Sequence, residues 1–205
     1  MVNHEDLNAY AFSMEQIKVR LERLRRVISA EITLGDETAD YEIVALNLRK
    51  ILELIAFSSL SANRESYAKV HAGYTEHWSA KKLLKSISAI NPDFFPHPLA
   101  PEVTKTNGVI NFKSETGDVL TRDDFEHLMD RCAEVIHVWN PYSRKARNVD
   151  FMLPIPEWLN RITRLLNVHT VRLAGTTNII LVLMQDPKNG SVNVCFAPDV
   201  TPLEG

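Results

Sequence analysis

Residues 131–142 bring together the residue types that could perform chemistry, in the stretch RCAEVIHVWNPY. Arg131 and His137 are six positions apart, and Glu134 lies midway between them. Histidine takes up and releases protons near neutral pH, and arginine offers a phosphate a fixed fork of donors. The pair therefore contains the minimum for RNA cleavage: His137 would move the protons, and Arg131 would hold the scissile phosphate and stabilise its developing charge. This chemistry needs neither a metal ion nor another cofactor, and we predict none.

These residues lie on one side of a predicted helix over residues 122–139. Thr121 is suited to be its N-cap, and Asp124 three positions later completes a capping box. The opposite side of this helix is apolar and consists of Phe125, Leu128, Met129, Cys132, Val135, Ile136 and Trp139. A rotation of about 100° per residue gathers ionisable side chains on the other stripe, namely His127, Asp130, Arg131, Glu134 and His137.

The spacing of Arg131 and His137 limits how they can meet. Six residues place the two side chains about 120° apart around the helix axis. They reach one phosphate either because arginine is long or because a second protomer supplies half of the site. A charged stripe is also typical of a solvated helix face, so a structural role stands beside the catalytic one. Glu134-x-x-His137 matches half of a di-iron motif, but the sequence holds no second such pair, and we predict no metal site.

The rest of the chain predicts further helices and a β-rich tail. Apolar residues recur at helical spacing over residues 5–31, 40–60, 78–90 and 156–167. The proline-rich residues 91–107 are expected to form an irregular arm, with a short strand at 109–112. Three segments rich in Val, Ile and Leu, separated by turn signals, predict an antiparallel meander at 169–174, 178–185 and 191–197. We therefore predict a mainly α protein with a small C-terminal antiparallel β-meander.

Composition narrows the class of protein. The chain has 205 residues, is 45% hydrophobic and carries a formal net charge of −3, which suits one well-buried core. The N-terminal residues lack the basic and apolar regions of a signal peptide, and the longest aliphatic run, residues 179–184, is too short to span a bilayer. The two cysteines form no CxxC motif. We expect a cytoplasmic protein that does not associate with membranes.

The charged residues are unevenly distributed. Residues 31–45 are acidic, whereas residues 144–172 hold six basic residues against two acidic ones. A second basic cluster consists of Lys18, Arg20, Arg23, Arg25 and Arg26. Such clusters can meet phosphates, although a solvated face is the ordinary explanation for a charge run. No glycine-rich phosphate loop, HExxH or GxSxG motif is present.

Three features of this sequence resemble the HEPN superfamily of small helical bundles. Arg131-x5-His137 fits the Arg-His spacing of that superfamily on a late helix. The segment NLRKILELIAF at residues 47–57, with Arg49 and Glu53, and the HxxNPY ending at residues 137–142 are also similar to it. The resemblance covers roughly residues 5–142. It departs from active members at Cys132, because a polar residue usually follows the arginine there.

The resemblance implies a metal-independent endoribonuclease of the toxin or phage-defence type. It implies a homodimer whose Arg-His motifs line a shared cleft, with an antitoxin or another protein as a possible partner. Arg131 and His137 would be catalytic, and Glu134 would orient or tune them. We assign RNA binding to Asn140, Tyr142, Arg144 and Arg147. Tyr142 would stack on a base or pack beneath the following loop.

Two hypotheses from different classes follow. In the first, residues 1–150 form a HEPN-like bundle that cleaves RNA, and residues 151–205 add a helix and a three-stranded meander packed on the bundle as one unit. In the second, the chain is a non-catalytic binding or regulatory module. Its basic residues 144–172 would then contact a nucleic acid, a nucleotide or an acidic protein partner.

Overall fold

The computed structural model describes residues 3–71, 79–106, 109–138, 140–142 and 150–197. In this part of the chain the helices are α1 (His4–Ile28), α2 (Glu37–Val70), α3 (Ala80–Ile90), α4 (Arg122–Ile136) and α5 (Ile155–Leu166). The strands are β1 (His97–Thr106), β2 (Val109–Ser114), β3 (Val168–Arg172), β4 (Ile179–Leu183) and β5 (Asn193–Ala197). The mainly helical fold with an antiparallel β tail is confirmed.

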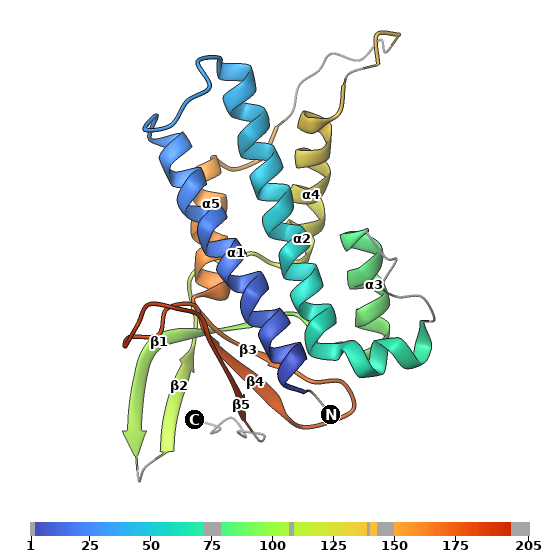
Figure 1. Ribbon diagram of the computed structural model, residues 1–205, viewed down its shortest axis with the longest axis vertical. Helices are drawn as coiled ribbons and strands as arrows, with labels where there is room; N and C mark the ends of the chain where they lie inside the picture. Colours follow the sequence, from blue (N-terminus) through green and yellow to red (C-terminus); the bar gives the residue numbers. More distant parts are fainter. Residues whose placement is uncertain (1–2, 72–78, 107–108, 139, 143–149, 198–205) are drawn as a thin grey trace.

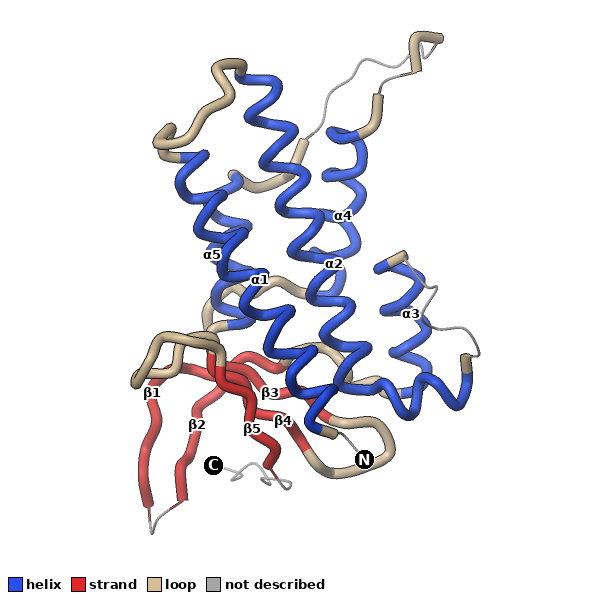
Figure 2. Tube along the Cα trace, viewed as in Figure 1, coloured by secondary structure: helices blue, strands red, loops and turns tan. Residues whose placement is uncertain are grey.

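The helices form a bundle that stands on a sheet. In Figure 1, α2 lies between α1 and α4, α5 lies behind α1, and α3 packs beside the C-terminal half of α2. The strands lie together across the lower end of the bundle (Figure 2). The C-terminal end of α4 therefore lies at the upper end, far from the sheet. No helix in the described residues is both long and apolar enough to cross a bilayer.

The sheet contains more of the chain than the predicted meander. Its strand order is β2-β1-β3-β4-β5, and every neighbouring pair is antiparallel. The meander of β3, β4 and β5 is confirmed, but the prediction of an irregular arm is wrong from His97 onward. The pairing of β1 is irregular around its prolines. Its register with β2 shifts between Leu99 and Val103, and its pairing with β3 is limited to His97 and Pro98. Proline is tolerated at such irregularities since it has no N–H to donate.

The helix α2 is longer than the predicted segment 40–60. Its C-terminal half contains serines and asparagines, which favour turns because their side chains compete for backbone groups. Here these side chains bond back within the helix: Ser58 and Ser59 donate to the Ile55 carbonyl at 2.8 and 3.1 Å, and Asn63 donates to the Ser59 carbonyl at 2.8 Å. The helix therefore continues to Val70 with its polar groups satisfied.

Two polar networks are buried where the helices meet the sheet. His169 of β3 donates from Nδ1 to the Leu166 carbonyl at 2.8 Å, so its Nε2 accepts from the Tyr10 hydroxyl of α1 at 2.7 Å. Both side chains are fully buried. Beside them, the Asn63 carbonyl oxygen accepts from the Asn91 amide at 2.9 Å and from the Ala174 N–H at 3.0 Å. These contacts join α1 and α2 to the sheet.

Candidate functional site

The helix α4 begins as its sequence predicts. The Thr121 hydroxyl accepts from the Asp124 N–H at 3.1 Å, and the Asp124 carboxylate accepts from the Thr121 N–H at 3.1 Å. Phe125, Leu128 and Cys132 are fully buried against the rest of the bundle. This packing fixes the rotation of α4 and turns its charged stripe away from the core. Trp139, which was predicted to extend the apolar stripe, lies outside the described residues.

The guanidinium of Arg131 is bound within its own helix. Its Nη2 lies 2.7 Å from a carboxylate oxygen of Glu134, one turn closer to the C-terminal end. The Arg131 side chain is 28% exposed and that of Glu134 is 42% exposed. The Nε atom of Arg131 is shielded from solvent and has no hydrogen-bond acceptor in the described part of the chain. Arg131 thus has an unused donor and a partner that solvent can reach.

His137 is the C-cap residue and does not belong to the last helical turn. Its N–H donates to the Ala133 carbonyl at 3.0 Å, and its φ and ψ of −80° and 140° turn the chain out of the helix. The helix thus ends three residues before the predicted boundary at residue 139. The His137 side chain is exposed, and Val138 after it is 95% exposed. The imidazole can therefore meet a ligand from solvent without any rearrangement of the core.

Residues 138 and 140–142, which follow His137, are exposed. The Asn140 side chain accepts from the Tyr142 N–H at 3.0 Å, which forms a tight local turn. Tyr142 is 90% exposed, and the loop that follows it, residues 143–149, lies outside the described residues. Its ring is free to stack on a base or a partner side chain. Arg144 and Arg147 lie outside the described residues, and the structure does not place them relative to Tyr142.

Two features where α2 and α4 pack together have structural roles. They are the Arg49–Glu53 pair of α2 and Cys132 of α4. The Nε atom of Arg49 donates to Glu53, four residues later in α2, at 3.0 Å, which forms an intrahelical ion pair. Burial raises the pKa of the Cys132 thiol to about 12, and the positive charge of Arg49 opposes this rise. Cys132 is therefore a protonated core residue at neutral pH and is not a nucleophile. A protonated thiol can be buried like an apolar side chain, so Cys132 can belong to the apolar stripe of α4 directly after Arg131.

A hollow lies between the first turns of α2 and the C-terminal end of α4. It has a volume of about 240 Å³ and is lined by Leu34, Ala39, Glu42, Ile43, Leu46 and Ile136. Ile136 directly precedes His137, so an apolar surface lies next to the candidate site. Leu34 is 62% exposed, and Leu46 is also exposed. Apolar side chains that are exposed together mark surfaces that bind a partner.

The basic segment 144–172 is a weaker candidate than its sequence suggests. Arg161 lies 3.3 Å from Asp124, 3.5 Å from Glu157 and 3.7 Å from Asp118, and Arg172 lies 3.6 Å from Asp93. Glu157 lies in the preceding turn of α5, and the other three carboxylates lie outside residues 144–172. A count of charges over residues 144–172 therefore misses most of these partners. Two of the arginines assigned to an anionic partner are therefore already neutralised within the fold.

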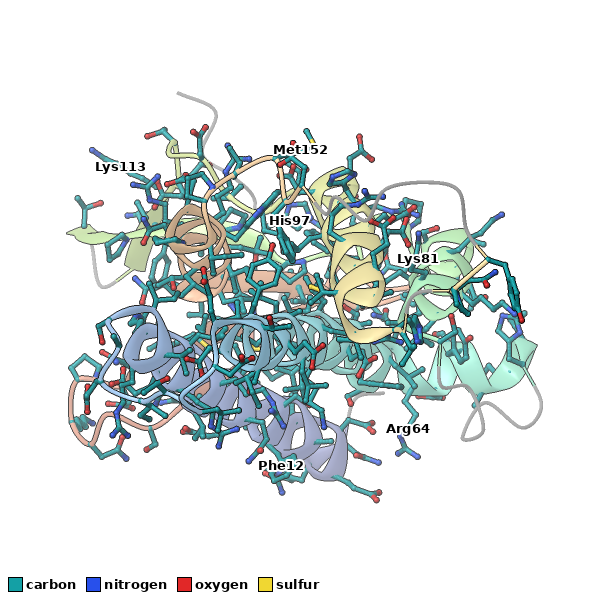
Figure 3. All side chains as sticks on the ribbon, turned by 90° about the horizontal axis from the view of Figure 1, so that it is seen from above. Phe12, Arg64, Lys81, His97, Lys113 and Met152 are labelled. Atoms are coloured by element: carbon teal, nitrogen blue, oxygen red, sulfur yellow. The ribbon has the colours of Figure 1, made fainter. Side chains whose placement is uncertain are left out.

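Other charged groups near α4 are also paired. Lys81 of α3, labelled in Figure 3, donates to both carboxylate oxygens of Asp130 at 2.9 Å. Among the described residues, no three histidine, cysteine or carboxylate side chains gather where they could hold a metal ion. Of the charged stripe, Asp130 is thus paired, and the Nε2 atom of His127 is shielded from solvent with no hydrogen-bond partner among the described residues. Arg131, Glu134 and His137 remain as the group that a ligand can reach. Comparisons of the chain with protein-family models, curated proteins and solved structures give no match.

Proposed function

We propose that the protein is a metal-independent endoribonuclease of the HEPN type. His137 acts as the proton-transfer group and Arg131 as the phosphate clamp, and two chains contribute to one cleft. The observation that carries this proposal is the placement of His137. It is an exposed histidine at the end of α4, one turn beyond the Arg131–Glu134 pair.

The chemistry assigned to these residues is transesterification. His137 takes the proton of a 2′-hydroxyl, the 2′-oxygen attacks the adjacent phosphorus, and the bond to the 5′-oxygen breaks. A proton returned to that 5′-oxygen completes the cleavage and leaves a 2′,3′-cyclic phosphate and a 5′-hydroxyl. Arg131 donates to the non-bridging oxygens as their charge grows. Glu134 positions the guanidinium through the 2.7 Å contact before RNA binds.

A second protomer supplies what one chain lacks in this proposal. Arg131 and His137 are about 120° apart around the α4 axis, so each side chain can face its counterpart in another copy. The exposed Val138 and the hollow beside Ile136 offer an apolar surface for that contact. A dimer formed there would also enclose the imidazole, which a single chain leaves open to solvent.

The reaction type is tested with two substrates of the same mixed sequence, one RNA and one DNA, incubated with the protein in EDTA. The proposal expects cleavage of RNA alone, with 2′,3′-cyclic phosphate and 5′-hydroxyl ends identified by mass spectrometry. Cleavage of both substrates, or cleavage that appears only when a divalent cation is added, would rule out this mechanism.

A non-catalytic protein-binding module is the second candidate function. It is favoured by the 95% and 90% exposed side chains of Val138 and Tyr142, which flank the Asn140 turn. If neither nucleic acid is cut, this candidate gains support, and the Val138→Asp/Tyr142→Asp double variant becomes the informative one. It should abolish binding to a partner that docks on this turn, whereas His137→Ala should leave that binding intact.

A further inference from the structure

The fold divides the basic cluster of α1 into two sets with different surroundings. Lys18, Arg25 and Arg26 have partners in other segments of the fold. The Lys18 ammonium donates to the Gly190 carbonyl at 2.6 Å, Arg25 donates to the Thr163 hydroxyl at 3.2 Å, and Arg26 donates to Glu31 at 2.8 Å. These contacts attach α1 to α5, to the turn before β5 and to the loop after α1. This set therefore has a structural explanation.

Arg20 and Arg23 are directed instead toward α2, and both converge on one atom. The Nη1 of Arg20 and the Nη1 of Arg23 donate to the Asn47 side-chain oxygen at 3.2 and 3.4 Å. Asn47 is only 4% exposed. Its Nδ2 donates to the Ile43 carbonyl at 2.8 Å, which orients the amide so that its oxygen faces the two arginines. The site is thus preorganised from the α2 side.

Arg20 and Arg23 each carry a positive charge, but the acceptor that they share is neutral and does not offset these charges. Burial and the neighbouring Arg23 both lower the pKa of Arg20, while Glu53 opposes them. The Glu53 carboxylate also accepts from Arg49 at 3.0 Å, so it is shared between cations. The Nε atom of Arg20 is shielded from solvent and has no acceptor among the described residues. An oxyanion placed between the two guanidiniums would accept from their remaining terminal N–H groups and offset the like-charge repulsion.

We infer that Arg20, Arg23 and Asn47 form the base of a phosphate-binding site on the seam between α1 and α2. Lys50, one turn beyond Asn47 on α2, is exposed. Several donors converging from two arginines favour a phosphate group over a single carboxylate, because a phosphate presents more acceptor oxygens.

The source of that phosphate is the backbone of a single-stranded RNA, and this part of the inference rests on the proposed function. The helices α1 and α4 flank α2 (Figure 1), and packed helices lie about 10 Å apart. The axes of α1 and α4, on either side of α2, are therefore about 20 Å apart. An RNA strand of several nucleotides can cover this distance, with one phosphate held on α1 while another is cut at His137.

The chain offers a matched control for testing this site. Arg20→Gln/Arg23→Gln and Arg25→Gln/Arg26→Gln remove the same charge from neighbouring positions of one helix, but only the first pair converges on Asn47. Binding of a fluorescently labelled single-stranded RNA is measured by anisotropy in the His137→Ala background, so that the probe is not cut. We expect at least a tenfold loss of affinity and a salt dependence reduced by about one phosphate contact for the first pair, and less than a threefold loss for the control.

Equal losses in the two double variants would overturn the inference, since they would indicate general charge attraction. Unchanged RNA binding in the Arg20→Gln/Arg23→Gln variant would also overturn it. A melting temperature lowered by several degrees in this variant without any ligand would overturn it as well, because the arginines would then serve to hold α1 on α2. The inference expects an unchanged or slightly higher melting temperature, since repulsion is relieved.

Pyrophosphate separates the two possible sources of the phosphate. If pyrophosphate raises the melting temperature of wild type but not of Arg20→Gln/Arg23→Gln, while wild type binds no RNA, the phosphate site stands and a small phosphate ligand replaces RNA as its source. That result would contradict the proposed nuclease function and leave the site intact. If wild type binds and cuts RNA and both variants bind it equally, the nuclease proposal stands and the phosphate site fails.

Discussion

The two ends of the bundle place a histidine in opposite environments, one buried and the other exposed. At the end that meets the sheet, His169 is fully buried, and both of its ring nitrogens are hydrogen-bonded to protein groups. At the other end, His137 is exposed, and its backbone N–H donates to the Ala133 carbonyl. A buried histidine with fixed partners holds a structure together, whereas an exposed one remains available to a ligand.

The same contrast holds for the asparagines of the two ends. Asn63 is 3% exposed and joins Asn91 and the Ala174 backbone through one carbonyl oxygen. Asn140 is exposed and only closes a local turn. We therefore expect substitutions at the sheet end to change the free energy of unfolding, and substitutions at the α4 end to change function alone.

The largest effect on stability is expected for Asn63→Ala. The substitution leaves the part-buried Ala174 N–H without its acceptor and removes one acceptor of the buried Asn91 amide. We expect a loss of about 4 kcal/mol in the free energy of unfolding, measured by urea denaturation. Asn140→Ala is the matched control and should change this free energy by less than about 0.5 kcal/mol. Similar losses in the two variants would remove the distinction between the ends.

The next effect concerns pH and depends on His169. Burial lowers the pKa of His169 to about 4, from an ordinary value near 6.5. The unfolded chain therefore takes up a proton between pH 6.5 and 4 that the folded protein does not bind, so the contribution of His169 to stability is complete above pH 6.5 and is lost as pH falls toward 4. The loss amounts to about 3 kcal/mol.

The His169→Gln variant isolates this contribution from that of the carboxylates. We expect it to be less stable than wild type at pH 7, and the difference between the two proteins to shrink as the pH is lowered to 4.5. Urea denaturation at both pH values measures this difference. A gap that stays constant with pH would mean that His169 is not kept neutral by the fold.

A smaller effect is expected for Tyr10→Phe. This change keeps the ring in place but leaves Nε2 of His169 without the hydroxyl that donates to it at 2.7 Å. The cost of one unsatisfied buried acceptor is about 2 kcal/mol. The matched control is Tyr142→Phe, which removes the hydroxyl of a 90% exposed side chain and should be neutral in thermal unfolding. A neutral Tyr10→Phe would show that the hydrogen bond contributes nothing to the stability of this end.

The sequence predicts local features of the fold better than contacts between distant segments. The apolar stripes of α1 and α4 and the Thr121 capping box depend on neighbouring residues, and they are predicted correctly. The strand β1 is missed because its prolines disfavour a strand, and its pairing with β3 joins residues that are distant in the sequence. The partners of Arg161 are missed for the same reason, since Asp118 and Asp124 approach it only through packing.

The candidate site shows the same limit. The sequence places Arg131, Glu134 and His137 on one stripe, but the intrahelical ion pair and the C-cap position of His137 depend on side-chain conformation and on where α4 ends. The convergence of Arg20 and Arg23 on Asn47 joins residues that are 27 and 24 positions apart. The sequence signal for it was the basic cluster on α1, which did not distinguish the two sides of that helix.

The most direct test of the nuclease proposal is the cleavage rate of a labelled mixed-sequence RNA in EDTA for wild type, His137→Ala and His4→Ala. His4 is an exposed histidine at the first residue of α1, at the opposite end of the bundle (Figure 1). The proposal predicts at least a hundredfold slower cleavage for His137→Ala, a wild-type rate for His4→Ala, and melting temperatures within about 1 °C of wild type for both. A His137→Ala protein that cuts RNA at the wild-type rate would contradict the proposal, because the exposed histidine of α4 would then have no part in the reaction.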